Sequence, residues 1–348
     1  MNALYSLFAV FALVVIALVG AGAAGMEQLF GLYIPWLAIA VFLVGFVAKV
    51  IGWAKSPVPF RIPTTAGQMK SHDWIRHDKY DNPATAGQTF VRMALEVLLF
   101  RSLFRNLTAQ RFGSAQDGVD VKIRYASAKW LWLFALIFHY SFLVVFIRHW
   151  RLFLDPVPSA LLALEYADTF LQIGAPALYM SGAALALGVS LLLLRRFVVP
   201  QVRYISQPAD YFPLFLILGV ALSGILMRYW AKTDIMAVKE VTMALFSLNP
   251  AVHIEGIGVV FFVHVFLVSC LIAYLPFSKL MHMGGVFLSP TRNLPNDSRA
   301  RYHRNPWNDP NVKAHSYAAY EDEFREKMIE AGLPVEKTLE EAAKTEAQ

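Results

Sequence analysis

The sequence predicts an all-α membrane protein in which six transmembrane helices form a helical bundle, with a long cytoplasmic loop and a cytoplasmic tail. Hydrophobic residues make up 57% of the 348 residues and charged residues only 16%, with a mean hydropathy of +0.47. A soluble domain carries about 25% charged residues. Six apolar segments also reach the roughly 20 residues that a helix needs to cross a bilayer. Both observations exclude an ordinary soluble domain.

The expected spans lie at residues 3–25, 32–53, 131–153, 170–194, 211–230 and 257–280. The first competes with a cleaved signal peptide, because small residues follow its apolar core. It has no basic residues before that core, however, and the core is longer than signal peptides use. We therefore expect a retained helix.

Polar segments set the predicted topology and the division of the chain. Residues 56–127 contain several prolines and an excess of Lys and Arg, and arginines also follow the fourth span. Basic loops stay in the cytoplasm, which places both termini there. Within residues 88–107, four charges among apolar residues indicate an amphipathic surface helix and not a seventh span. The expected parts are two N-terminal helices (1–55), the loop (56–127), a four-helix core (128–285) and a tail (286–348) with a helix at Tyr317–Ala331.

Four histidines lie within the apolar spans. His139 and His149 are ten residues apart in the third span, about 15 Å of helix rise, and His264 and His282 are eighteen residues apart in the last, roughly 27 Å on one face of an ideal helix. Imidazole in hydrocarbon is costly and needs a partner. Taken alone, each histidine is explained equally well as a ligand or as a core histidine bonded to a backbone carbonyl. Two helices that each carry a pair of histidines favour ligands shared between the helices.

The topology fixes how these histidines pair. The third span runs outward and the last runs inward, so His149 faces His264 near the outer side and His139 faces His282 near the inner side. Imidazole is a common axial ligand of haem iron. The sequence therefore predicts a di-haem bundle with two haems b. They are expected to be non-covalent, because no Cys-x-x-Cys-His motif occurs.

Charge and cysteine content limit the partners. The formal net charge of +6 is explained by basic cytoplasmic loops, so nucleic-acid binding is not expected. The single cysteine, Cys270, cannot ligate an iron–sulfur cluster, which needs about four thiolates. Any such cluster belongs to a partner subunit, for which the long loop and the tail are the expected docking segments.

The last third of the chain resembles the gamma subunit family of respiratory nitrate reductases. The carrying motif is FFVHVFLVSCLIAYLPFSKLMHM, which includes His264 and His282, and His139 with His149 match the pair on that family's other ligand helix. The extra first helix, the long loop and the tail depart from the family. They make the whole chain resemble the DsrM family, the membrane cytochrome b subunits of Dsr complexes in sulfur and sulfate respiration.

This resemblance implies a cell-membrane subunit that exchanges electrons between menaquinone and a cytoplasmic iron–sulfur subunit. That partner would be DsrK-like and akin to heterodisulfide reductase, alongside other Dsr complex subunits. Two alternatives stay open: a haem-containing anchor and electron wire without its own quinone site, or a nitrate reductase gamma-type quinol oxidase subunit. A transporter with proton-relay histidines is a third class, but the chain shows no internal repeats or interrupted helices of that kind.

Arg148, His253 and Glu255 are the candidate quinone-site residues. His253 and Glu255 lie at the outer entrance of the last span, where quinol protons need an acceptor. Their His-Ile-Glu-Gly sequence resembles His-Leu-Asp-Gly in nitrate reductase subunits. Arg148 adjoins His149, where it would bond a quinone oxygen or a haem propionate. The competing interpretation is that all three only cap helix ends or bind propionates, and the family's lysine after the first ligand helix has no equivalent at 155–169.

Overall fold

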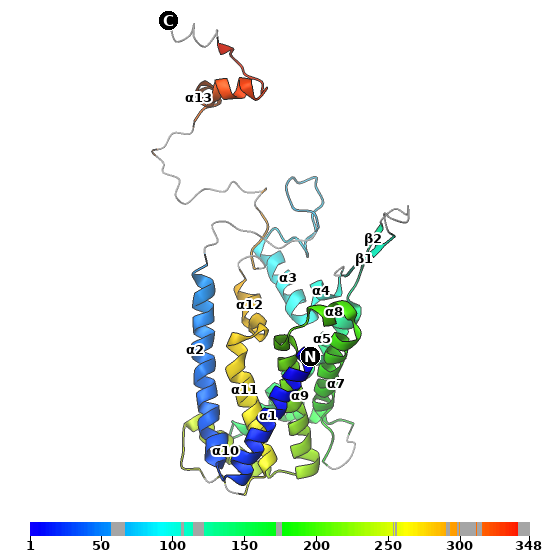
Figure 1. The fold of residues 1–348 in the computed structure, drawn as a ribbon, viewed down its shortest axis with the longest axis vertical. Coiled ribbons are helices and arrows are strands. Elements are labelled where there is room, and N and C mark those ends of the chain that lie inside the picture. Colours follow the sequence, from blue (N-terminus) through cyan, green and yellow to red (C-terminus); the bar gives the residue numbers. More distant parts are fainter. Residues whose placement is uncertain are drawn as a thin grey trace. The chain divides into compact units, whose positions relative to one another are not determined.

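The computed structural model describes residues 1–348 apart from a set of short segments and the end of the tail. The residues left out are 57–66, 106–107, 114–121, 172–175, 253, 255, 290–292, 298, 300–310, 312–314 and 340–348. The chain forms two units, one of Met1–Met69 with Arg76–Asn296 and one of Lys70–Ile75 with Asp297–Gln348. The first unit contains the helix bundle (Figure 1).

Six helices in the described part are long and apolar enough to cross a membrane. This confirms the all-α class and the predicted number of spans. They are α1 (Asn2–Ala17) with the π-helical η1 (Leu18–Ala23); η2 (Leu29–Tyr33) with α2 (Ile34–Ala54); α5 (Lys129–His149) with η4 (Trp150–Leu152); α7 (Met180–Val198); α9 (Pro208–Leu226) with η5 (Met227–Ala231); and α11 (Val259–Tyr274) with η6 (Leu275–Phe277).

Shorter elements occupy the connections and the tail. They are α3 (Ala86–Leu99), α4 (Arg101–Phe104), an antiparallel hairpin of β1 (Thr108–Phe112) and β2 (Lys122–Ala126) with Thr108 opposite Ala126, α6 (Ser159–Asp168), α8 (Pro200–Ile205), α10 (Ile235–Ser247), η7 (Lys279–Met281), α12 (His282–Leu288) and α13 (Tyr317–Glu330). The amphipathic segment in the loop is thus two helices, and α13 begins where the tail helix was expected. Sequence analysis did not predict the hairpin, α6 or α10, which are too short and too mixed in polarity to stand out by hydropathy.

The fourth span begins later than predicted, at Met180 and not at residue 170. Phe170 and Leu171 lie in a turn after α6. Pro176 lies in a turn before α7 and explains part of the difference, because proline lacks the N–H that a helix interior needs.

The last span is interrupted, whereas a single helix was expected through His282. The α-helix ends at Tyr274, η6 contains Pro276, and Ser278 is extended (φ −118°, ψ 174°) before η7 and α12. Proline cannot donate the helical hydrogen bond and its ring clashes with the preceding turn. His282 therefore begins a new short helix, and its direction no longer follows from helical spacing to His264.

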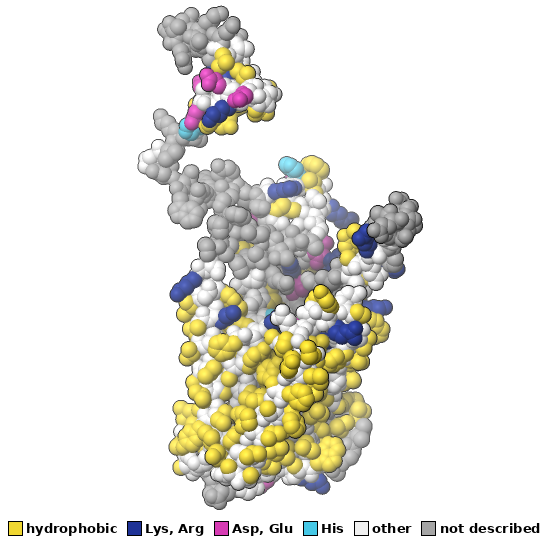
Figure 2. All heavy atoms as spheres, viewed as in Figure 1, with side chains coloured by type: hydrophobic (Ala, Val, Ile, Leu, Met, Phe, Trp, Pro, Cys, Tyr) yellow, Lys and Arg dark blue, Asp and Glu magenta, His cyan; other side chains and the backbone are white. Residues whose placement is uncertain are grey.

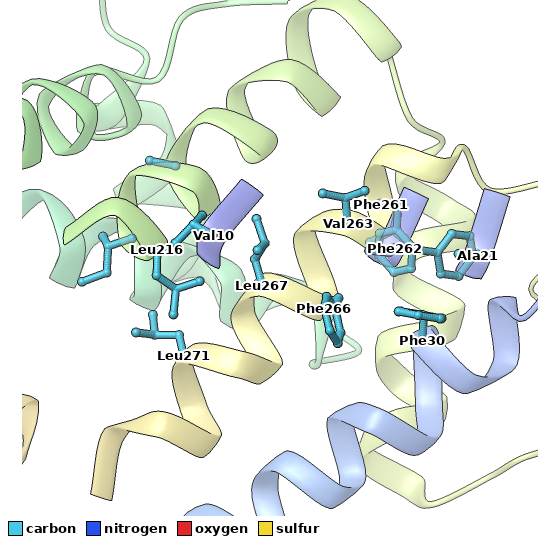
Figure 3. Packing of buried hydrophobic residues seen from close by; sticks show 14 of the residues in the cluster. Val10, Ala21, Phe30, Leu216, Phe261, Phe262, Val263, Phe266, Leu267 and Leu271 are labelled. Carbon is cyan, nitrogen blue, oxygen red and sulfur yellow. The ribbon is translucent and has the colours of Figure 1, made fainter. Parts of the chain in front are cut away.

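The helices pack in the order α5, α7, α9, α11, α2, with α1 against α9 and α11. The core follows α11: Phe266 meets Phe30 of η2 edge to face with centroids 5.2 Å apart, while Leu267 and Leu271 lie toward Leu216 of α9 (Figure 3). Figure 2 shows apolar side chains covering the visible face of the bundle, with Lys and Arg toward its ends. That surface suits lipid contact.

Candidate functional site: two histidine pairs and a buried arginine cluster

The structure brings the four predicted histidines together as two pairs, although His282 begins α12 beyond the last span and is exposed. The ring centroids of His149 and His264 are 6.4 Å apart, with an angle of 15° between the ring planes. Those of His139 and His282 are 6.1 Å apart, with planes at 84°. The first pair, called here the outer pair after the predicted topology, lies where α5 ends and α11 begins. The second, the inner pair, lies where α5 meets the start of α12.

Each of the four imidazoles uses Nδ1 for a hydrogen bond within the protein. Three of the bonds go to backbone carbonyls: His139 to Ala135 (2.8 Å), His149 to Val145 (2.7 Å) and His282 to Lys279 (2.9 Å). A carbonyl only accepts, so Nδ1 carries the proton and Nε2 is left with a free lone pair. Such a bond on the far ring nitrogen is the usual support of a metal-binding histidine.

His264 has a different support. Its Nδ1 lies 2.9 Å from Ser223 Oγ, and that hydroxyl donates to the Val220 carbonyl at 3.0 Å. With its proton committed to Val220, the hydroxyl accepts from His264. His264 Nε2 is therefore also unprotonated.

The spacing and the donor set fit a haem between the rings of each pair. An imidazole nitrogen lies about 2 Å from a bound metal ion and about 1 Å from its own ring centre, so two imidazoles on one ion have centroids roughly 6 Å apart. A bare ion such as zinc needs about four ligands, and the described residues contain no cluster of three or more His, Cys, Asp or Glu side chains that could hold an ion. A porphyrin supplies the remaining ligands itself.

Two glycines allow neighbouring helices to pack closely against the histidine-bearing helices. A Cβ at Gly188 of α7 would lie 2.9 Å from the Phe138 backbone nitrogen, beside His139. One at Gly224 of α9 would lie 3.3 Å from His264 Cε1. Among the described residues, α5 packs mainly against α7, with α4, α6 and η4 as further neighbours. The two histidine pairs join α5 to α11 and to α12.

A buried polar cluster adjoins the outer pair. Arg148 pairs with Asp168 at 2.7 Å, and their side chains are 11% and 5% exposed. Asp168 also accepts from the Ser181 amide (2.7 Å) and hydroxyl (2.6 Å), which ties the end of α6 to the start of α7. Arg148 is therefore held in a buried ion pair at the end of α5, one residue before His149.

Tyr179 is the centre of the same cluster. The guanidinium carbons of Arg148 and Arg228 lie 3.4 and 3.8 Å from its ring centroid. Its hydroxyl donates to Glu165, which also pairs with Arg151. Burial, followed by the bond to Glu165, raises the pKa of Tyr179 above its usual value, so the phenol stays protonated.

The structure describes some, but not all, of the site residues predicted from the sequence. The four histidines and Arg148 are described, whereas His253 and Glu255 lie outside the described residues. Sequence analysis missed Ser223, Asp168, Tyr179 and Arg228. Arg228 offered a usable signal, since a charged residue near the end of a span often marks a functional site. The other three gave none.

Fold and site together define a polytopic membrane protein whose helical bundle holds two facing histidine pairs. The sequence matches the nitrate reductase gamma subunit family over residues 94–296, more than half of the chain. The chain therefore belongs to the nitrate reductase gamma subunit family, which confirms the resemblance drawn from its motifs.

Two archaeal proteins are similar over most of their length. The chain is 46% identical over 290 residues to the Hdr-like menaquinol oxidoreductase cytochrome b-like subunit of Archaeoglobus fulgidus, covering 82% of this chain and 85% of the relative. It is 41% identical over 292 residues to the protein of the same name in Archaeoglobus profundus, covering 82% and 84%. Both are consistent with the resemblance to the DsrM family.

Proposed function

We propose that this chain is a di-haem cytochrome b subunit that exchanges electrons between menaquinol and a cytoplasmic iron–sulfur subunit in sulfur or sulfate respiration. The observation that carries the proposal is the pairing of four imidazoles at two levels of the bundle, each ring supported through Nδ1. The names of the two relatives, which include menaquinol oxidoreductase and cytochrome b-like, support the same function.

His149 with His264 and His139 with His282 would hold the two haems b through Nε2. When bound, haem supplies reversible one-electron exchange at its iron. The protein orients the imidazoles through Ala135, Val145, Lys279 and Ser223. Two sites at different depths provide a path for electrons across the membrane.

We place quinol oxidation beside the outer pair. His253 and Glu255 precede α11, and in the proposed topology they lie at the outer membrane edge, where they would accept the quinol protons. The electrons would leave inward, toward a DsrK-like iron–sulfur subunit docked on the loop and the tail. This orientation, with both termini cytoplasmic, follows from the basic loops, and the need for a partner follows from the single cysteine.

Reduction of the purified protein by a menaquinol analogue tests this function. Both haems should be reduced, and the double variant H253Q/E255Q should be reduced at least about tenfold more slowly, because proton transfer to a positioned base contributes that much or more. Haem content should not change. The matched control, H77Q/E96Q in the loop, should reduce at the wild-type rate.

Two other results have defined meanings. Unchanged kinetics in H253Q/E255Q would contradict the outer quinol site and move it to the inner pair. A wild-type protein that holds two haems but is not reduced by quinol would instead support the alternative of an anchor and wire without its own quinone site.

A further inference from the structure

Two arginines occupy opposite faces of one tyrosine beside the outer pair. The guanidinium carbons of Arg148 and Arg228 are both within 4 Å of the Tyr179 ring centroid, at 3.4 and 3.8 Å. Two such groups on one face would overlap, so the ring must lie between them. Tyr179 is held in place by its hydroxyl bond to Glu165 and by its amide, which donates to Tyr229 Oη at 2.9 Å.

The cluster contains one positive charge more than its carboxylates balance. Asp168 pairs with Arg148, and Glu165 pairs with Arg151. Arg228 donates from Nη2 to the Ala177 carbonyl at 3.2 Å, and no carboxylate of the described residues lies within ion-pairing distance of it. Arg228 is partly buried, and a charge withdrawn from water without a counter-ion is unfavourable, so an anionic ligand would stabilise it.

The same two arginines have unused donors. Nε of Arg148 and Nε of Arg228 are buried, and within the described residues neither has a hydrogen-bond partner. Buried donors are rarely left unsatisfied in folded proteins. Two N–H groups and one excess charge in one place match the acceptors of carboxylate groups, which arginine binds well.

Both arginines lie in helical turns that contact the outer pair. Arg148 directly precedes His149. Arg228 lies four residues after Gly224, whose Cβ position is 3.3 Å from His264 Cε1, and residues four apart share a helix face. A haem between His149 and His264 would carry its two propionate carboxylates at its edge.

We propose that Arg148 and Arg228, stacked on Tyr179, bind the propionate carboxylates of the outer haem through their free Nε–H groups. The inference rests on the proposed di-haem function and deepens it. A quinone oxygen, the other ligand considered for Arg148, is neutral and leaves the excess charge unbalanced. Arg228 and Tyr179 thereby join the outer site as binding and positioning residues.

The test compares haem b with its dimethyl ester, which lacks the carboxylate charges. Apoprotein of the His139→Ala variant, in which the outer pair alone remains, is titrated optically with each form. It should bind haem b at least about tenfold more tightly than the diester, since hydrogen bonds to charged groups are strong. Adding R228Q or R148Q should abolish most of that preference, while the diester still binds. R203Q, which replaces an exposed arginine of α8 outside this cluster, should keep it.

Each result decides one claim. If H139A binds neither form of haem, the proposed function is wrong, and the propionate site is wrong with it. If H139A binds haem b and its diester equally, or if R228Q and R148Q both keep the wild-type preference, the propionate site is wrong while the haem assignment stands. If R228Q does not assemble, R148Q and the H139A comparison decide the question alone.

Discussion

Among the four histidines, His264 alone is supported by a side chain. Its Nδ1 bonds to the Ser223 hydroxyl at 2.9 Å, whereas the other three bond to backbone carbonyls that substitution cannot remove. A hydrogen-bond acceptor on the far nitrogen makes a ligand imidazole more basic, and basicity favours ferric over ferrous iron. Ser223 is therefore a residue through which the outer site can be altered without touching the inner one.

Substitution S223A should raise the midpoint potential of the outer haem and leave the inner one unchanged. A net hydrogen bond is worth about 1 kcal/mol, which for a one-electron couple corresponds to a shift on the order of tens of millivolts. The measurement is a redox titration followed optically. S269A is the matched control, because Ser269 is buried on the same helix as His264 and donates to the Val265 carbonyl of its own helix. Equal potentials in S223A and S269A would contradict the assigned role.

At the scale of elements, the break between α11 and α12 positions the inner pair. The Lys279 carbonyl that orients His282 belongs to η7, directly after the Pro276 turn. Gly45 of α2 packs on this turn: a Cβ there would lie 2.9 Å from Pro276 Cβ and 3.1 Å from Phe277 Cζ. The contact with Pro276 has no room for a methyl group, and the Phe277 ring would also have to shift.

Substitution G45A should therefore weaken haem binding at the inner pair and spare the outer pair. Overpacking of this kind costs about 1–3 kcal/mol, and we expect a lower temperature for loss of the inner haem absorbance. G52A on the same helix is the control, since nothing lies within 4 Å of a Cβ at Gly52. The account of the turn is wrong if the two variants lose the inner haem at the same temperature.

The spans could be predicted from sequence because a bilayer admits few alternatives to apolar helices of fixed length. The sequence shows Pro276 within the last span, but a proline there can either kink or end a helix. The sequence alone does not decide between the two. Where His282 lies after such a break depends on contacts with α2. The expectation of one continuous helix was wrong, although the rings of His139 and His282 do lie side by side.

At the scale of the whole molecule, the loop between the second and third spans is also part of the inner site. The Phe100 ring lies 4.9 Å from that of His139, and the freed carbonyls at the end of α3 accept from bundle side chains: Leu99 from Trp132 (2.7 Å) and Leu98 from Tyr140 (2.7 Å). Phe100 has a left-handed backbone (φ 48°) that ends α3. Such carbonyls at a helix end need partners. The predicted loop and the predicted core therefore share this site.

The polar cluster at the outer end marks the limit of sequence reasoning. Asp168, Tyr179 and Arg228 come from three different segments, and only Arg228 stands out in its local sequence, as a charge near the end of a span. They form one polar cluster only because the ends of α5, α6, α7 and α9 come together in the fold. The histidines could be paired from sequence because four similar groups and one topology leave few combinations, whereas a mixed polar cluster leaves many.

The central claim is that each histidine pair holds one haem, and haem stoichiometry in the four single alanine variants tests it most directly. Wild-type protein should contain two haems b per chain by pyridine haemochrome assay. H139A and H282A should each retain one haem with the same spectrum and potential, and H149A and H264A should each retain the other. The control H77A should keep both. Two haems per chain in all four variants, or loss of different haems within one pair, would contradict the account.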